Sequence, residues 1–425
     1  MHYLYENIRV INPATGIDDV MDVLIGPGQV SLAPTEVPDQ VERISGASKW
    51  CLPGLIDLQV HFRQPGFEYK ETLATGAQAA LAGGVTSVVV MPNTSPTLDN
   101  AELVAQQTEW MNSAEGIELF VAAAATYSLA GKENTNVREL KEAGAVAITD
   151  DGLPVMNDDV MRKSLEDCKA NDLLFMQHAE DIEMTQHAPM NLSKTSEALG
   201  VKGQAAEAEA RIVERDIGLV EQTGARYHVL HTSTGRSLQA VREAKGKGLP
   251  VSCEVSPHHI LLSDTACAQG DPNKKMNPPL RDESDRLALI EGLVDGTVDA
   301  VATDHAPHSD EEKAQGFEKA PFGVIGLETA FSAVLHFVHN EKITPTRAVE
   351  LMTSGPARVL KKESELGSLV GDQQPAHVCI VDPDLEWTAT PETFQGKSKN
   401  SAFLNHAFKG KVLATFVDGL LKYQH

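Results

Sequence analysis

The chain has 425 residues, 42% of them apolar, and its 36 basic and 60 acidic residues give a formal net charge of −24. Such an acidic balance would repel phosphate backbones, so we expect no nucleic-acid partner. The chain has no run of about 18 apolar residues and no basic-then-apolar start, which predicts a cytoplasmic protein without membrane spans. The five cysteines are scattered and form no CxxC pair, so we expect reduced, buried thiols: Cys51, Cys168, Cys253, Cys267 and Cys379.

From residue 53 onward, short apolar, β-branched runs alternate with amphipathic stretches, which is typical of repeated βα units around a parallel sheet. The amphipathic stretches predict helices over 71–82, 100–112, 204–222 and 236–247. Eight such units predict an α/β fold of the (β/α)₈ barrel class. The expected strands are Leu55–Val60, Thr86–Met91, Ile117–Ala124, Ala145–Thr149, Leu173–Gln177, Arg226–Leu230, Pro250–Val255 and Val298–Thr303.

The two ends of the chain have a different pattern, with short strand-like pieces punctuated by Gly, Pro and Asp. These pieces are Glu6–Ile11, Val20–Ile25, His377–Val381 and Lys411–Val417. Since neither end has enough apolar residues for a core of its own, we expect the two to pack together as one small β-sandwich. The predicted domains are therefore a discontinuous sandwich of residues 1–52 and 363–425, and a barrel of residues 53–362.

Polar side chains follow six of the expected strands at the points where those strands end. They are His61, Asn93, Asp151, His178, His231 and Asp304. In a parallel barrel the carboxyl ends of the strands share one face, so residues far apart in sequence converge there. A single histidine at a strand end is often a hydrogen-bonded structural residue. Five His or Asp residues on one rim indicate a site instead.

Neutral imidazole and carboxylate are the usual ligands of catalytic zinc, which keeps one position open for water and lowers the pKa of that water to about 7. A carboxylate can bridge two metal ions or carry a proton, so Asp151 and Asp304 are suited to different roles. The chain contains no GxSxG nucleophile elbow and no phosphate-binding GxxxxGK[ST] loop. A zinc-dependent hydrolytic site is therefore the function that the residues predict.

Short motifs at these strand ends carry a family resemblance. They are Pro53-Gly54-Leu55-Ile56-Asp57, His61-Phe62-Arg63-Gln64-Pro65-Gly66, Met91-Pro92-Asn93-Thr94, Thr149-Asp150-Asp151-Gly152, His178, His231-Thr232-Ser233, Asn277-Pro278-Pro279-Leu280-Arg281 and Thr303-Asp304-His305-Ala306-Pro307-His308. Together they resemble the amidohydrolase superfamily, and within it the bacterial dihydroorotases that are similar to the dihydroorotase part of the animal multifunctional protein. The resemblance extends over essentially the whole chain.

The resemblance implies a reversible, zinc-dependent interconversion of N-carbamoyl-L-aspartate and L-dihydroorotate in pyrimidine biosynthesis. In that family a metal-held hydroxide attacks the cyclic amide, and the strand-eight aspartate, here Asp304, acts as general base and acid. The resemblance implies that His178 and His231 hold one metal and that His61 and Asp304 belong to a second. The bridging group, a carboxylated lysine in many relatives, looks like Asp151 here, with Asp150 as the alternative.

The family also implies where a substrate carboxylate binds. It assigns that group to Arg63, Asn93 and His308, puts Asn277 near the ring, and gives Pro321, Phe322 and Gly323 to the pocket wall. A guanidinium offers a planar fork of donors that matches a carboxylate. The alternatives are a surface ion pair for Arg63 and proline-linked turns for the two asparagines. Residues 309–322 form either a mobile loop over the site or a solvated connection, and His258 and His259 are treated as structural.

Gln59 departs from the family pattern, because relatives usually have His-x-His where this chain reads Gln59-Val60-His61. A glutamine carbonyl suits zinc less well than imidazole, so the metal position that includes His61 should be weakened. The set Asp151, His178 and His231 still supplies three ligands and an open position. We therefore predict one tightly bound zinc and a second that is weak or absent, with Gln59 a doubtful ligand.

Two other functions stay open on sequence alone. A dihydroorotase-like chain can be a catalytically weak or silent partner of aspartate carbamoyltransferase, and Gln59 favours that reading while the other site residues oppose it. A hydantoinase- or allantoinase-type hydrolase would use the same chemistry on rings that lack the carboxylate suited to Arg63. The expected assembly is a homodimer, with a complex with aspartate carbamoyltransferase as a further possibility.

Overall fold

The computed structural model describes residues 1–113, 116–370 and 374–425. Eight parallel strands form the barrel in the order β15-β14-β13-β10-β9-β8-β7-β6. All eight strands expected from the sequence are present, with ends that differ by a few residues. They are β6 (Leu55–Val60), β7 (Val85–Val90), β8 (Glu118–Ala124), β9 (Ala145–Thr149), β10 (Leu174–Gln177), β13 (Tyr227–Val229), β14 (Val251–Val255) and β15 (Ala300–Val301).

The barrel strands are apolar on both faces, because helices cover the outside and side chains fill the inside. All six residues of β7 are buried, for example. Small residues such as Ala122, Ala147 and Ala300 pack inside with Leu58 and Met176, so the barrel is a filled core. The ring closes where His61 N donates to His305 O at 2.8 Å. The rim above that closure carries the polar side chains.

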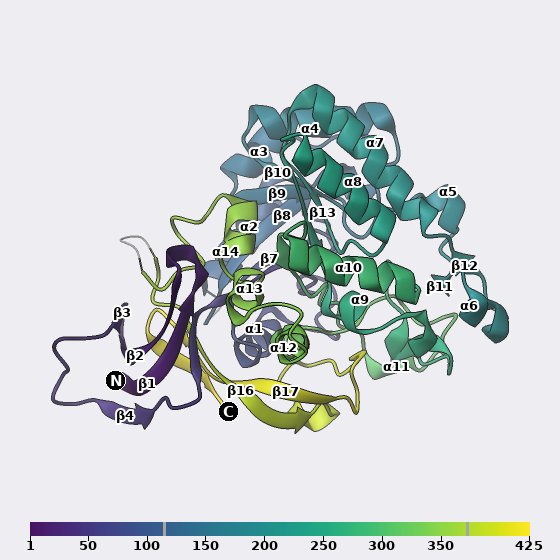
Figure 1. Cartoon of the computed structure of the whole chain (residues 1–425). Coiled ribbons are helices and arrows are strands. Elements are labelled where there is room, and N and C mark those ends of the chain that lie inside the picture. Colours follow the sequence, from purple (N-terminus) through teal and green to yellow (C-terminus); the bar gives the residue numbers. More distant parts are fainter. Residues whose placement is uncertain (114–115, 371–373) are drawn as a thin grey trace.

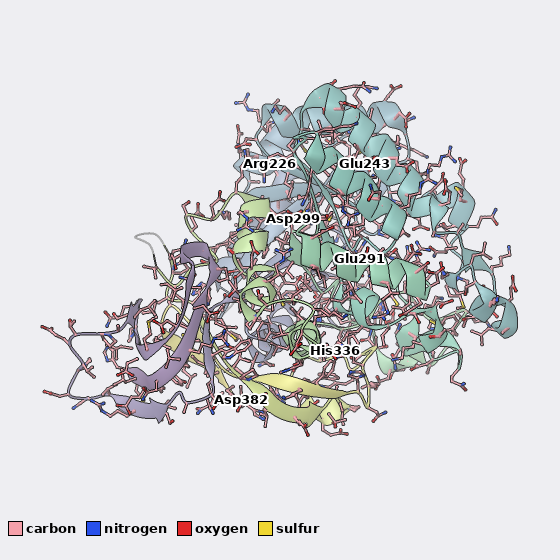
Figure 2. The ribbon with its side chains drawn as sticks, in the orientation of Figure 1. Arg226, Glu243, Glu291, Asp299, His336 and Asp382 are labelled. Carbon is pink, nitrogen blue, oxygen red and sulfur yellow. The ribbon has the colours of Figure 1, made fainter. Side chains whose placement is uncertain are left out.

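Helices surround the barrel, and several begin at a side-chain cap. Thr72 caps α1, Asn157 caps α4 and Asp282 caps α10. The covering helices are α1 (Leu73–Ala82), α2 (Ala101–Ser113), α3 (Val137–Glu142), α4 (Asp158–Ala170), α7 (Glu207–Thr223), α8 (Gly235–Gly246), α10 (Glu283–Asp295), α12 (Ala330–His339), α13 (Pro345–Glu350) and α14 (Ser354–Leu360). Charged side chains such as Glu243 on α8 and Glu291 on α10 point outward from this layer (Figure 2).

Short elements lie in the loops above the rim. They are α5 (Ile182–Thr185), β11 (Met190–Asn191), α6 (Lys194–Leu199), β12 (Gly203–Gln204), α9 (Pro257–Leu261) and α11 (Asp310–Lys313), with the 3₁₀ turns η2 (Tyr127–Leu129), η3 (Asp264–Cys267) and η4 (Pro272–Lys274). Residues 309–322 therefore contain the short helix α11. Loops at the carboxyl ends of barrel strands are where such folds place binding residues.

The two ends of the chain pair with each other beside the barrel, as expected from the sequence (Figure 1). The sheet order is β18-β17-β16-β5-β1-β2-β3, and β4 pairs with β1. Its strands are β1 (Tyr3–Asn12), β2 (Ile17–Gly26), β3 (Gln29–Leu32), β4 (Glu42–Ser45), β5 (Trp50–Pro53), β16 (Val378–Thr388), β17 (Ala407–Val417) and β18 (Leu420–Gln424), with the 3₁₀ turns η1 (Pro13–Thr15) and η5 (Pro391–Thr393). Phe416 packs edge-on against Tyr3 and Tyr5, which joins the two ends through a small apolar core.

The five cysteines are all buried and unpaired, as expected. Among the described residues, none of the helices has the length and apolar character needed to cross a bilayer.

Candidate metal centre and active-site cleft

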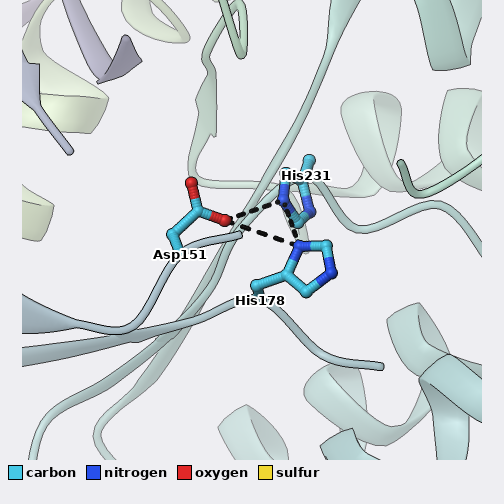
Figure 3. A group of neighbouring side chains, drawn as sticks. All are labelled: Asp151, His178 and His231. Atoms are coloured by element: carbon cyan, nitrogen blue, oxygen red, sulfur yellow. Dashed lines mark hydrogen bonds and ion pairs between the residues drawn. The ribbon is translucent and has the colours of Figure 1, made fainter. Parts of the chain in front are cut away.

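Asp151, His178 and His231 meet at the rim of the barrel, although they follow three different strands (Figure 3). His178 Nδ1 lies 3.0 Å from His231 Nε2, and each of these nitrogens lies 3.4 Å from Asp151 Oδ1. A tetrahedral zinc ion with ligands at about 2.0–2.1 Å separates its ligand atoms by about 3.3 Å. The three atoms therefore already have the spacing of three corners of a zinc tetrahedron.

The surroundings of Asp151 Oδ1 are the clearest sign of a cation-binding site. This oxygen is buried and accepts no hydrogen bond from the part of the chain that the structure describes. Burial would raise the pKa of Asp151, but the three neighbouring imidazoles outweigh burial and hold that pKa well below its ordinary value. Burial alone would lower the pKa of His178, but Asp151 and Glu180 raise it to about 10. A divalent cation would replace such protons on binding, so the residues fit the metal that the family implies.

A second group lies on the other side of the same carboxylate. His61 Nε2 is 3.2 Å from Asp151 Oδ2 and 3.0 Å from Asp304 Oδ1. His61 Nδ1 donates to Asn93 Oδ1 at 3.0 Å, which directs Nε2 toward the two carboxylates. Burial lowers the pKa of His61, but its hydrogen bonds with Asp151 and Asp304 raise it to about 9. Five of the six rim residues predicted from the sequence thus form two groups that share Asp151, and the sixth, Asn93, contacts His61.

Gln59 contacts the shared carboxylate through its amide group. Its side chain is fully buried, and Nε2 donates to Asp151 Oδ2 at 2.9 Å. The Gln59 carbonyl oxygen has no hydrogen-bond partner among the described residues. An N–H group therefore occupies the Asp151 oxygen nearest to His61. The two oxygens of Asp151 therefore differ. Oδ1, which faces His178 and His231, accepts no hydrogen bond from the described residues, whereas Oδ2, which faces His61, accepts one from the Gln59 amide.

Asp150 points away from the cleft. Its carboxylate accepts hydrogen bonds from the Thr126 backbone N–H, at 2.9 Å, and from the Thr126 hydroxyl. Burial raises the pKa of Asp150 to about 6. Of the two adjacent aspartates that the sequence leaves open, Asp151 is therefore the one that meets the histidines.

Both site residues His231 and Asp304 have left-handed backbone conformations, with φ of 30° and 50°. Non-glycine residues adopt such angles rarely, and they do so mainly where the surrounding structure holds a side chain in a required direction. The sharp turns at these strand ends direct the two side chains into the cleft.

We call the sets Asp151-His178-His231 and His61-Asp151-Asp304 the two metal-suited groups. The cleft above them has a volume of about 310 Å³. Most of the residues named from the sequence line it, with Gly152 and Ala306 of the quoted motifs. Leu129 and Leu153 also line it, and the sequence did not single them out. Pro321 is not among the lining residues, and its carbonyl instead accepts from Lys313. Gly323 has a φ of 122°, and a Cβ there would lie 2.6 Å from Ala306 Cβ, so this wall needs glycine.

Arg63 is a cation without an anion on the wall of this cleft. It is 9% exposed, and its Nε donates to the Pro307 carbonyl at 3.2 Å. No carboxylate lies within 4.0 Å of its guanidinium in the described ranges, which excludes the ion-pair alternative there. Burial lowers the pKa of Arg63. Since buried cations are normally paired, the guanidinium is suited to an anionic ligand.

His308 borders Arg63 but has both of its ring nitrogens engaged. Nε2 donates to the Phe322 carbonyl at 2.8 Å, and Nδ1 lies 3.2 Å from Lys70 Nζ. Burial, Arg63 and Lys70 lower the pKa of His308 to about 2, so the ring is neutral. The side chain therefore supports the cleft wall as well as lining it. Lys70, which sequence reasoning missed, has no motif that distinguishes it from a surface lysine.

Glu180 is a second residue that sequence reasoning missed. It accepts hydrogen bonds from His178 Nε2 at 3.0 Å and from Asn277 Nδ2 at 2.8 Å. These bonds outweigh burial and lower the pKa of Glu180 to about 2. The other ring nitrogen of His178, Nδ1, is the one that lies near Asp151 and His231. Carboxylates placed in this way orient metal-binding histidines. The signal in the sequence was only an acidic residue two positions after a strand-end histidine.

His258 and His259 are not part of this site. Both are buried, and His259 Nε2 contacts the Pro278 carbonyl at 3.0 Å. Burial lowers the pKa of both rings, to about 4 for His259. Neither residue lines the cleft.

The chain is similar to known proteins in sequence and in fold. A family model described as Dihydro-orotase-like matches residues 48–237. The chain is 42% identical over 425 residues to a dihydroorotase of Solibacter usitatus (strain Ellin6076), spanning 100% of this chain and 98% of that protein. It is 40% identical over 425 residues to a dihydroorotase of Syntrophotalea carbinolica (strain DSM 2380 / NBRC 103641 / GraBd1), spanning 100% and 99%.

Among solved structures, the chain is similar to the L-hydantoinase (dihydropyrimidinase) of Arthrobacter aurescens, with a TM-score of 0.88 and 22% identity over 99% of this chain and 96% of that one. It is also similar to the dihydropyrimidinase of Brevibacillus agri NCHU1002, with a TM-score of 0.86 and 22% identity over 100% and 95%. At this identity the likeness establishes the fold alone. The barrel class expected from the sequence is thereby confirmed.

Replacing Glu180 tests whether it orients His178. We expect Glu180→Gln to weaken zinc binding by about 10–100-fold, because the imidazole loses its charged hydrogen-bond acceptor. Competition with a chromophoric chelator measures the change. Glu183→Gln, an exposed glutamate on the following turn, is the matched control and should bind zinc like the parent. Equal zinc affinity in both variants would contradict the role given to Glu180.

Proposed function

The chain belongs to the dihydroorotase family and is a hydrolase of cyclic amides, and we propose that it interconverts N-carbamoyl-L-aspartate and L-dihydroorotate in pyrimidine biosynthesis. One observation carries the choice of substrate. The buried, unpaired guanidinium of Arg63 shares a cleft with the metal-suited group of Asp151, His178 and His231. A ring that bears a carboxylate supplies the anion that Arg63 lacks, and its amide can lie over the metal position.

We propose zinc as the metal, held by Asp151 Oδ1, His178 Nδ1 and His231 Nε2. Two imidazoles and one carboxylate are a donor set that suits catalytic zinc. When bound, the ion activates water at neutral pH and polarises a carbonyl. Glu180 keeps Nδ1 of His178 directed at the ion by accepting the proton of Nε2.

Arg63 and Asn93 orient the substrate in this proposal. The guanidinium donates to the carboxylate, and the Asn93 amide nitrogen faces the same ligand because its oxygen is engaged by His61. Leu129, Leu153 and Phe322 supply apolar wall and exclude water from the ring. Orientation of this kind is a large part of the rate gain in enzymes.

Asp304 carries the proton. Its Oδ1 is engaged by His61 Nε2 at 3.0 Å, while Oδ2 has no hydrogen-bond partner among the described residues and is free to act. In ring opening, water adds to the amide carbon, Asp304 takes the proton of that water, the C–N bond breaks and the proton passes to the leaving nitrogen. Ring closure is the reverse: Asp304 takes the nitrogen proton and water leaves.

A turnover assay with Arg63→Met tests the substrate. We expect the zinc-loaded parent to close the ring of carbamoyl aspartate, and the variant to lose about 100-fold or more in kcat/KM because a charged contact to the substrate is removed. Arg138→Met, at an exposed position on α3, is the matched control and should behave like the parent.

Two outcomes would contradict the assignment. A parent that turns over neither substrate with added zinc would favour the silent partner of aspartate carbamoyltransferase. Unchanged turnover of dihydroorotate by Arg63→Met would contradict the contact between Arg63 and the substrate carboxylate, on which the choice of substrate rests.

The second metal position, made of His61, Asp151 and Asp304, is proposed to be weak or empty. The Gln59 amide already satisfies Asp151 Oδ2, so a cation there would have to displace an N–H donor and leave it unpaired in a buried place. The first position carries no such cost, because Asp151 Oδ1 accepts no hydrogen bond among the described residues. One zinc per chain follows from this difference.

Gln59→His is expected to raise the metal content after dialysis from about one to about two zinc ions per chain, since an imidazole would replace the amide donor with a ligand. Elemental analysis measures the content without reference to activity. Gln59→Met removes the donor without adding a ligand and should stay near one. If Gln59→His holds no more zinc than Gln59→Met, Gln59 does not lie at the metal.

We also propose a homodimer in the cytoplasm, with aspartate carbamoyltransferase as a possible partner in a larger assembly. The supports are the family resemblance and the five unpaired cysteines, which suit a reducing compartment.

A further inference from the structure

Lys275 and Lys313 are buried beside the cleft without an acidic partner. They are 4% and 5% exposed, and neither forms an ion pair among the described residues. Burial lowers the pKa of both, and that of Lys313 falls to about 7. A basic group is costly to bury unless hydrogen bonds satisfy it. The hydrogen bonds of the two ammonium groups therefore indicate what stabilises them in the interior.

Both ammonium groups donate to main-chain carbonyls of one loop. Lys275 Nζ donates to the carbonyls of Glu318, at 2.9 Å, and Ala320, at 2.7 Å. Lys313 Nζ donates to the Pro321 carbonyl at 3.0 Å and lies 3.5 Å from the Lys275 carbonyl. The two ammonium groups thus bind three main-chain carbonyls of the loop of residues 316–323. The Lys313 ammonium also contacts the Lys275 carbonyl, which links the two lysines.

This loop forms the wall of the cleft next to His308 and Arg63. The Lys275 ammonium lies 4.5 Å from the centre of the Phe322 ring, and Gly323 N donates to the Lys275 carbonyl at 3.0 Å. The Phe322 carbonyl in turn accepts from His308, which borders Arg63. A change in the position of Lys275 would therefore reach the residues around Arg63.

The segment that carries Lys275 also reaches the metal side of the cleft. Asn277, two residues further on, donates to Glu180 at 2.8 Å and lies 3.2 Å from His178 Nε2. Its side-chain oxygen accepts from Gln204 at 3.2 Å, which fixes the amide in this orientation. One short segment, residues 275–277, thus contacts both walls.

We propose that Lys275 and Lys313 are positioning residues, a two-lysine clasp that holds loop 316–323 against segment 275–277 and so sets the width of the substrate cleft. The clasp itself rests on the hydrogen bonds, and its effect on substrate rests on the proposed function. Asp304, His178 and His231 are held by the barrel strands rather than by this loop. Loss of the clasp should therefore weaken substrate binding much more than the chemical step.

Hydrogen exchange in the substrate-free protein tests the clasp. Lys275→Met and Lys313→Met keep the length of the side chain but remove the donor, and should speed amide exchange in residues 317–323 by about tenfold or more. Lys319→Met is the matched control, because Lys319 lies exposed on the same loop, and it should exchange like the parent. Unchanged exchange in both clasp variants overturns the proposal.

Kinetics supply the second readout. We expect KM for dihydroorotate to rise by about tenfold in each clasp variant, with kcat within about threefold of the parent and zinc content unchanged. A fall in kcat at constant KM overturns the positioning role. If the methionine variants do not fold, Lys275→Gln and Lys313→Gln retain one polar group and replace them in the exchange experiment. Faster exchange in the glutamine variants then supports the clasp, and exchange equal to that of the parent overturns it.

The two proposals fail in different ways. If the parent does not turn over dihydroorotate, the proposed function is contradicted. The clasp is then tested by amide hydrogen exchange alone. Exchange that equals the parent in the clasp variants contradicts the clasp, whatever the enzyme turns over.

Discussion

The carboxylate of Asp151 is the group on which the site depends. One oxygen faces His178 and His231 and accepts no hydrogen bond among the described residues, while the other meets His61 and the Gln59 amide. A buried carboxylate in this position needs positive charge around it. Among the described residues Oδ1 has no hydrogen-bond donor, whereas Oδ2 accepts from Gln59. This difference is the physical reason for expecting one metal ion rather than two.

The rest of the cleft follows from the way the barrel brings strand ends together. The metal-suited group follows β9, β10 and β13 whereas Arg63 follows β6, and all of these side chains line one cleft. Neither group alone selects a substrate. A metal centre suits hydrolysis of many amides, whereas an unpaired buried guanidinium restricts the choice to rings that carry an anion.

The sequence predicted the barrel and its rim well, because β-branched runs of strand length, separated by amphipathic helices, leave few other folds. It could not separate Asp150 from Asp151, since adjacent residues at a strand end differ only in direction, and the Thr126 contacts of Asp150 link segments 24 residues apart. Glu180 and the two clasp lysines have no motif, because their roles arise from tertiary contacts. Pro321 was assigned to the cleft wall, but the structure uses its carbonyl to hold the loop.

Anomalous scattering at the zinc edge, from crystals grown with zinc, tests the one-metal centre most directly. We expect one strong peak at coordination distance from Asp151 Oδ1, His178 Nδ1 and His231 Nε2, and a weak or absent peak between His61 and Asp304. Two peaks of equal strength would contradict the role of Gln59. A single peak elsewhere would contradict the centre itself.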